Sequence, residues 1–460
     1  MPDTDFSSLN LPPAQLSNLQ QLGYHNMTPI QQQSLPLLLA GKDVIAKSKT
    51  GSGKTAAFAI GLLCNINPRD FATQSMVICP TRELSTQVAS EIRRLARYQQ
   101  NIKVVVLCGG QSIGPQIGSL QHGAHIVVGT PGRIKDHLRK KTLSLSRLNT
   151  LVLDEADRML DMGFYNDIES IIHEMPVQRQ TLLFSATYPE KIRSLSASFQ
   201  NNPVEVSVES VQGSEKIQQH FFLCEKSELF QGLHRLLMNH PIESAVIFCN
   251  TIKLVKEVCS YLVESGISAK AIHGDLEQRD RDQVLVQFSN HSCSLLVATD
   301  VAARGLDIED LPAVINFELP REPEVYIHRI GRTGRAGKEG LALSLLTGSE
   351  KYRLDAIAEL LDKNLSFESI DKLREQDRKL EQPPMVTLCV SGGRKDKIRP
   401  GDIVGALTGE AGIEAEHIGK ITVLDFVSYV AIARPMANAC PLYKSPSPRT
   451  RTRTRMPASA

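Results

Sequence analysis

A glycine-rich segment, SKTGSGKT at residues 48–55, has the residue types that a nucleotide phosphate requires. The strand-like run DVIA precedes it and the helical pattern AAFAIGLL follows, so backbone N–H groups at a helix start would face the anion. Lys54 would reach the β- and γ-phosphates, and Thr55 would offer a hydroxyl to Mg²⁺. A purely structural turn does not explain the Lys-Thr pair. The candidate ATP-binding residues of this loop are Ser48, Lys49, Thr50, Gly51, Ser52, Gly53, Lys54 and Thr55.

Two adjacent acids, Asp154 and Glu155, follow the apolar run TLVL about 100 residues later. We expect Asp154 to hold Mg²⁺, directly or through water, and Glu155 to orient and activate the attacking water. Two acids at a strand end can also be a solvated turn. Because they occur with the phosphate loop in one α/β domain, we favour a site that hydrolyses ATP, with ATP and Mg²⁺ as the expected cofactors.

Three arginines recur at a three-residue spacing in YIHRIGRTGRAG, residues 326–337. Arg329, Arg332 and Arg335 are predicted to converge on one anionic site, although a basic surface loop is the alternative. Arg332 and Arg335 then act as arginine fingers, each worth roughly 10³–10⁵ in rate. Because they follow a second set of strands, we expect the ATPase to form only when two domains close.

Short β-branched runs alternate with helical patterns over most of the chain. This alternation predicts parallel sheets with right-handed crossovers, and therefore two tandem α/β domains. The predicted boundaries are an N-terminal segment 1–32, domains 33–205 and 215–362, a linker 363–383, a small α+β domain 384–439 and a basic tail 440–460.

The composition excludes several protein classes. The 460 residues are 42% hydrophobic and 22% charged, which is typical of a soluble globular protein. No apolar run approaches the ~20 residues of a membrane helix and no secretory signal is visible, so we expect a cytoplasmic protein. The nine cysteines include no C-x-x-C pair, which favours reduced thiols. The net charge of +2 does not by itself indicate a nucleic-acid partner.

Eleven short motifs, in this order along the chain, resemble those of the DEAD-box ATP-dependent RNA helicases. The sequence is most similar to the bacterial DbpA subgroup of that family. The motifs are GYHNMTPIQ (23–31), SKTGSGKT (48–55), PTRELSTQ (80–87), GG (109–110), TPGR (130–133), DEAD (154–157), SAT (185–187), VIFCNT (246–251), HGDLEQRDR (273–281), ATDVAARGLD (298–307) and HRIGRTGR (328–335). The resemblance implies two RecA-like P-loop domains. It also implies an RNA-stimulated ATPase that pries short duplexes open.

The resemblance also implies roles for single residues. Gln31 would pair with the adenine edge, Tyr24 would stack on its face, Phe6 would hold this segment, and Asp307 would bind the ribose. Ser185, Thr187 and His328 would couple ATP to RNA. The RNA contacts would be Pro80, Thr81, Arg82, Gly110, Thr130, Arg133, Gly274, Arg281 and Thr299.

Residues 385–433 read as the β-α-β-β opening of an RNA-recognition fold. The usual stacking signature is nearly absent, so Arg394, Lys395 and Lys397 are the expected RNA contacts. Prolines oppose the missing second helix and fourth strand. We therefore expect an incomplete domain with one sheet face uncovered, partly unfolded or loosely packed.

The subgroup resemblance implies a partner: a 23S ribosomal RNA hairpin near the peptidyl-transferase centre, met in pre-50S particles during large-subunit assembly. We expect a monomer. The alternatives are an ATP-gated RNA clamp or a general RNA chaperone without specific targeting, and a DNA helicase is disfavoured by the motif set.

Overall fold

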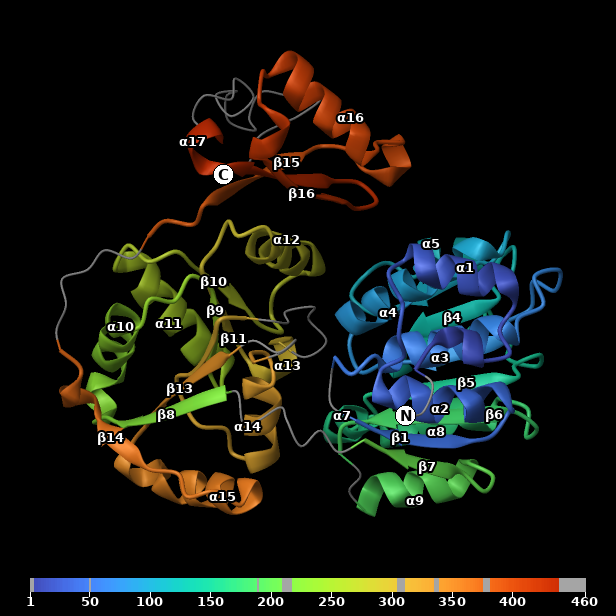
Figure 1. Ribbon diagram of the computed structural model, residues 1–460, viewed down its shortest axis with the longest axis horizontal. Helices are drawn as coiled ribbons and strands as arrows, with labels where there is room; N and C mark the ends of the chain where they lie inside the picture. The colour runs from blue at the N-terminus through green and yellow to red at the C-terminus, as the bar shows by residue number, and fades with distance from the viewer. Residues whose placement is uncertain are drawn as a thin grey trace. The chain divides into compact units, whose positions relative to one another are not determined.

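The computed structural model describes residues 4–48, 51–187, 190–208, 217–303, 311–334, 339–374 and 381–437. The chain divides into two compact units, with the division after residue 211. Each unit contains a seven-stranded parallel sheet, and the second unit also contains a three-stranded antiparallel sheet (Figure 1). The predicted fold class, α/β with two tandem parallel sheets and a small α+β domain, is confirmed.

The first sheet has the strand order β3-β4-β2-β5-β6-β1-β7, and all of its neighbours are parallel. Strands that follow one another in the chain are therefore not always neighbours in the sheet. In sheets of this kind ligands bind beside the loops at the carboxyl ends of the strands. The strands are β1 Val44–Lys47, β2 Ser75–Ile78, β3 Val104–Leu107, β4 Ile126–Gly129, β5 Thr150–Asp154, β6 Gln180–Ser185 and β7 Val204–Ser207.

Helices cover both faces of this sheet (Figure 1). Successive side chains of β1 show why both faces must be covered: Val44 and Ala46 pack in one apolar core and Ile45 in the other. The helices and 3₁₀ turns of the first unit are η1 Phe6–Ser8, α1 Pro13–Gln21, α2 Pro29–Leu39, α3 Lys54–Cys64, α4 Arg82–Leu95, η2 Ala96–Tyr98, α5 Gly114–Leu120, α6 Pro131–Arg139, α7 Ala156–Asp161, α8 Tyr165–His173 and α9 Glu190–Phe199.

The second parallel sheet has the order β10-β11-β9-β12-β13-β8-β14. Its strands are β8 Ile217–Leu223, β9 Ala245–Phe248, β10 Ala269–Ile272, β11 Leu295–Ala298, β12 Ala313–Asn316, β13 Gly340–Leu346 and β14 Phe367–Ser369. The helical segments are η3 Lys226–Glu228, α10 Leu229–Asn239, α11 Ile252–Glu264, α12 Gln278–Ser289, α13 Asp300–Ala303, α14 Pro323–Ile330, η4 Gly348–Glu350, α15 Lys351–Leu361 and η5 Ile370–Lys372.

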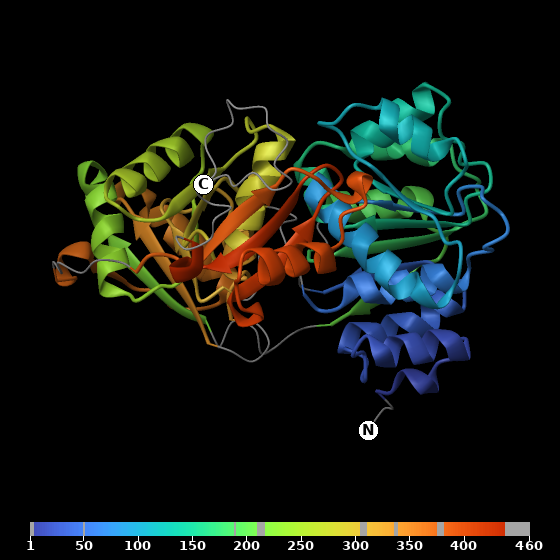
Figure 2. The ribbon, with the colours of Figure 1, turned by 90° about the horizontal axis from the view of Figure 1, so that it is seen from above.

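The small C-terminal sheet has β17 in the centre, between β15 and β16. Figure 2 shows α16 beside this sheet, where Ile403 of α16 and Leu407 of the following turn pack on Leu388, Val430 and Ile432. Its elements are β15 Met385–Val390, η6 Arg394–Asp396, α16 Pro400–Gly405, η7 Ala406–Glu410, η8 Ala415–His417, β16 Ile418–Val423, β17 Ser428–Ala433 and α17 Arg434–Ala437.

The sheet face that we expected to be exposed to solvent is buried. Tyr429 and Ala431, which point away from α16, are only 2% and 1% exposed. The Thr387 hydroxyl lies on the same face and is 2.7 Å from Ser292 Oγ, and Asn290 Nδ2 donates to it at 3.2 Å. The segment after α12 therefore contributes to covering this face of the sheet. The predicted absence of a second helix and fourth strand concerns residues 438–460, outside the described residues.

Candidate nucleotide and RNA site

The phosphate loop follows β1 and ends where α3 begins at Lys54. Lys54 is buried, and its Nζ donates to the Ser48 carbonyl at 2.7 Å, so the ammonium crosses the mouth of the loop. Gly51 and Gly53 have φ of 78° and 93°, a left-handed conformation that favours glycine. The Ser48 and Ser52 hydroxyls lie 2.8 Å apart. Lys49 and Thr50 lie outside the described residues.

Gln31 connects the start of α2 to this loop. Its Oε1 accepts from the Thr28 backbone N–H at 2.9 Å, and its Nε2 donates to the Gly53 carbonyl at 3.1 Å. A Cβ at Gly53 would lie 2.5 Å from Gln31 Nε2, so the approach itself requires glycine. The amide expected at the adenine edge is thus also a brace of the phosphate loop.

Tyr24 is held from two sides. Its hydroxyl donates to Glu91 Oε1 at 2.5 Å and accepts from Arg94 Nη2 at 2.7 Å, both on α4. Burial, together with Glu91, raises the pKa of Tyr24 to about 12, so the hydroxyl stays protonated. Phe6 is buried and meets the ring edge-on at 6.3 Å between centroids. Sequence reasoning missed Glu91 and Arg94, which carry no motif.

The two acids occupy different surroundings at the end of β5. Asp154 is 3% exposed, and burial raises its pKa to about 7 against the opposing charge of Lys54. Glu155 has φ of 52° and lies 3.2 Å from Arg158 Nη1, with both side chains buried. Within the described residues Glu155 Oε2 accepts no hydrogen bond. A buried carboxylate and the Thr55 hydroxyl are hard oxygen donors, which fit Mg²⁺.

Asp157, the last residue of DEAD, ties this edge to the SAT segment. Its Oδ2 accepts from the Thr187 N–H at 2.9 Å, the Thr187 hydroxyl at 3.0 Å and the Ala186 N–H at 3.1 Å. The Asp157 N–H donates to Ser185 Oγ at 3.3 Å. Ser185 and Thr187 thus meet Asp157 in the first turn of α7, and Asp157 is a candidate site residue that the sequence analysis did not name.

The expected RNA contacts of the first unit gather at loops beside this edge. Arg82 begins α4 and packs on Gly110, where a Cβ would overlap its guanidinium. Thr81 Oγ1 caps α4, and Arg133 Nη2 donates to the Gln111 carbonyl at 2.8 Å. Pro80 is buried and Thr130 precedes α6.

Behind these loops, a buried pair joins α5 to α6. His137 Nε2 lies 3.2 Å from Gln116 Oε1, and Gln116 Nε2 donates to the Cys108 carbonyl at 2.9 Å. Both side chains are buried.

In the second unit Arg329 is directed into its own domain, which corrects the prediction that it shares one anionic site with Arg332 and Arg335. Arg329 is 1% exposed and pairs with both oxygens of Asp300, at 2.6 and 2.8 Å. It also donates to Asn250 and Asn316 side chains. It is therefore an internal brace, because its donors are consumed inside the domain.

The other predicted residues of this unit lie on several elements. Arg332 follows α14 and is buried, His328 is half-buried on α14, and Thr299 precedes α13. Gly274 is exposed and Arg281 is half-buried on α12. Asp307 and Arg335 lie outside the described residues.

Three family models match consecutive parts of the chain: a DEAD/DEAH box helicase model at residues 28–195, a helicase conserved C-terminal domain at 228–337 and a DbpA RNA binding domain at 387–440. The chain is 53% identical over 436 residues to the ATP-dependent RNA helicase DbpA of Escherichia coli strain K12, covering 95% of each. The chain belongs to the DEAD-box family of ATP-dependent RNA helicases.

Other similar proteins support the assignment of the chain to this family. The DEAD-box ATP-dependent RNA helicase CshA of Bacillus subtilis is 43% identical, over 83% of this chain and 77% of its own. A solved structure of S. cerevisiae Dbp5 bound to RNA and ADP BeF3 has a TM-score of 0.74 at 30% identity, covering 80% of this chain and 96% of that one. Among the described residues, no helix is long and apolar enough to cross a membrane.

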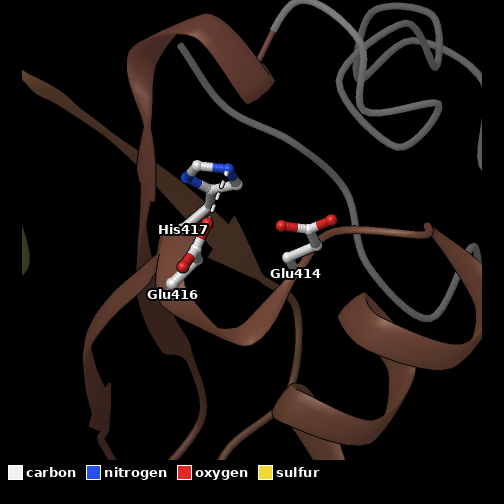
Figure 3. A group of neighbouring side chains, drawn as sticks. All are labelled: Glu414, Glu416 and His417. Atoms are coloured by element: carbon white, nitrogen blue, oxygen red, sulfur yellow. Dashed lines mark ion pairs between the residues drawn. The ribbon is translucent and has the colours of Figure 1, made fainter.

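A separate group of potential metal ligands lies in the small domain of the helicase. Glu414, Glu416 and His417 place ligand atoms within 4.8 Å of one another, and Glu416 is 3.7 Å from His417 Nε2 (Figure 3). Both glutamates are exposed. Exposed acids often gather without a metal, so the group does not define a metal site.

Proposed function

We propose that this helicase binds ATP with Mg²⁺ through the phosphate loop, Asp154 and Thr55, and uses hydrolysis to open short RNA duplexes locally. Glu155 activates the water, and Arg332 and Arg335 complete the site on domain closure. The observation that supports this proposal is the pair of hydrogen bonds from Thr187 to Asp157, which lies three residues beyond Asp154 in the same DEAD motif. That contact offers a path between phosphate chemistry and the RNA side.

We further propose that the RNA is 23S ribosomal RNA, met as a hairpin near the peptidyl-transferase centre in pre-50S particles. Support comes from the match of residues 387–440 to a DbpA RNA binding domain. On this proposal the helicase acts as a cytoplasmic monomer during large-subunit assembly.

The test is steady-state ATPase activity of the full chain with a 23S fragment that contains the hairpin. Matched controls are a fragment with a scrambled hairpin of equal length and DNA of the same sequence. Preferential stimulation by the true hairpin supports the proposal. Equal stimulation by both RNA fragments favours a general RNA chaperone. RNA binding that depends on ATP, without unwinding of a labelled duplex, favours an ATP-gated clamp.

A further inference from the structure

An exposed aromatic ring stands at the tip of the hairpin between β16 and β17. Phe426 is 74% exposed, and the turn that carries it is closed by the Leu424 N–H donating to the Val427 carbonyl at 2.9 Å. Phe426 and Tyr429 are the aromatic residues of the described segment 385–437, histidine aside. Tyr429 is buried, so Phe426 is the ring that solvent reaches.

The hairpin tip is fixed to the basic turn η6. The Arg394 N–H donates to the Leu424 carbonyl at 2.8 Å, and the Lys395 N–H donates to the Asp425 carbonyl at 2.9 Å. A Cβ at Gly393 would collide with the Leu424 carbonyl, so glycine permits this approach. Two segments 30 residues apart in sequence therefore present one surface.

This surface is positively charged. Arg394, Lys395, Lys397 and Arg399 are exposed, whereas the nearby acids are Asp396, Asp402 and Asp425, and Asp402 Oδ2 accepts from the Arg399 N–H at 2.8 Å. Asp396 Oδ2 already accepts from the Gly393 N–H at 2.9 Å. Asp425 is 3.8 Å from Arg394, and because both side chains are more than half exposed, the pair binds weakly and leaves the guanidinium accessible.

We propose that Phe426, Arg394 and Lys395 form one RNA contact, in which the ring stacks on an unpaired base and the cations hold its flanking phosphates. Aromatic stacking accepts any base, and cations bind phosphate without reading sequence. The contact thus selects unpaired nucleotides rather than a base sequence. A single ring among charges offers no apolar surface large enough to favour a protein partner. The inference rests on the proposed function, in which this domain binds RNA.

The test measures anisotropy of a labelled RNA hairpin with an unpaired loop, and of a blunt duplex with the same stem, on the full chain. Phe426→Ala should weaken hairpin binding about 5- to 100-fold, the range for one stacked base, and leave duplex binding and the salt slope unchanged. Phe426→Trp should bind the hairpin like the wild type. Lys395→Ala should weaken both RNAs and lower the salt slope by about 0.7–0.9.

The control is Tyr352→Ala, because Tyr352 is also an exposed aromatic at 64% but lies on α15. Hairpin binding unchanged in Phe426→Ala, or equal losses for hairpin and duplex, would overturn the inference. So would a loss in Phe426→Trp as large as in Phe426→Ala. If the wild type itself shows no RNA-stimulated ATPase, the proposed function fails instead. Circular dichroism of each variant checks that the domain stays folded.

Discussion

Asp154 and Glu155 are neighbours in the chain, but their surroundings differ, as the different tasks that we propose for them require. Asp154 faces Lys54, and its burial keeps the carboxylate poorly solvated until a cation approaches. Glu155 is turned by its left-handed backbone toward Arg158, whose Nη1 lies 3.2 Å from Glu155 Oε2, and that oxygen accepts no hydrogen bond within the described residues. On the proposed function, this carboxylate accepts a proton from the attacking water.

Glu155→Gln should lower ATP turnover about 10²–10⁴-fold, because the amide cannot take a proton from the attacking water. ATP and RNA binding should persist. The measurement is single-turnover hydrolysis beside fluorescent ATP binding, with Glu174→Gln, an exposed acid of the same unit, as the control. Since the change leaves Arg158 without its partner, thermal unfolding must show a folded protein. More than a tenth of wild-type turnover would remove Glu155 from this role.

Gln31→Ala should weaken ATP binding and narrow the preference for ATP over GTP. The amide is the expected reader of adenine, and its loss also frees the Gly53 carbonyl of the phosphate loop. One such hydrogen bond contributes about 0.5–1.5 kcal/mol. Competition binding of the two nucleotides measures the effect, with Gln33→Ala on the exposed face of α2 as the control. An unchanged ATP/GTP ratio would place adenine recognition elsewhere.

Helix α7 and the segment after β6 are joined by one carboxylate. Three donors of the SAT segment, residues 185–187, bind Asp157 Oδ2. A displacement of this segment would therefore break these bonds or displace Asp157 of the DEAD motif. Helices α5 and α6 are similarly joined through Gln116 and His137. Both contacts join segments that lie apart in the sequence, so neither follows from one motif alone.

Thr187→Val should separate ATP hydrolysis from unwinding. The change keeps the side-chain shape but removes the hydroxyl bond to Asp157, and a bond to a charged group is worth about 1.5–3 kcal/mol. We expect hydrolysis within about 3-fold of wild type and unwinding reduced about 10-fold, on the same scale. Duplex unwinding and ATPase assays run in parallel, with Ser170→Ala as the control, test this. Equal losses in both activities would contradict coupling through Thr187.

His137 should make stability pH-dependent. Burial lowers its pKa, reinforced by Arg133 and Lys140 and opposed by Asp136, so the folded state holds it neutral. Its contribution is therefore present above the unfolded pKa of about 6.5 and is lost as pH falls. Between pH 7.5 and 5.5 the loss is at most about 1.4 kcal/mol, and His137→Gln should lack it. Urea titrations of both proteins at the two pH values measure the difference, and parallel pH profiles would contradict it.

On the proposed function, the residues of the ATPase are divided between the two units of the molecule. The phosphate loop and acids belong to the first, and Arg332 belongs to the second. Arg329, which holds Asp300, fixes the segment from which Arg332 emerges.

Residues 1–210 alone should therefore bind ATP weakly and show no RNA-stimulated hydrolysis. The fragment lacks Arg332 and Arg335, the arginine fingers of the proposed function, and one such finger contributes roughly 10³–10⁵ in rate. The measurement compares ATPase activity of this fragment and of the full chain with saturating RNA. The fragment's circular dichroism and thermal unfolding show whether its sheet is intact. A fragment that hydrolyses ATP at the full RNA-stimulated rate would show that the second unit is dispensable for chemistry.

The sequence by itself was sufficient to predict the two parallel sheets and to locate the phosphate loop and the acids of the DEAD motif. These features depend on local order: apolar runs, turn residues and a helix start lie next to each other in the chain. The same local reasoning failed for Arg329, one of the three equally spaced arginines. Their equal spacing gave no sign that Arg329 turns inward to Asp300, Asn250 and Asn316, because those partners come from other strands.

Only the tertiary structure decided the contacts between distant segments. Glu91 and Arg94 hold Tyr24, and Gln116 meets His137, although none of these pairs has a local signature. Residues 290–292 contribute to covering the sheet face predicted to be wet, and Gly393 brings the basic turn against the hairpin of Phe426. The physical reason is that hydrogen bonding and burial depend on neighbours in space, which the fold brings together from positions far apart in the chain.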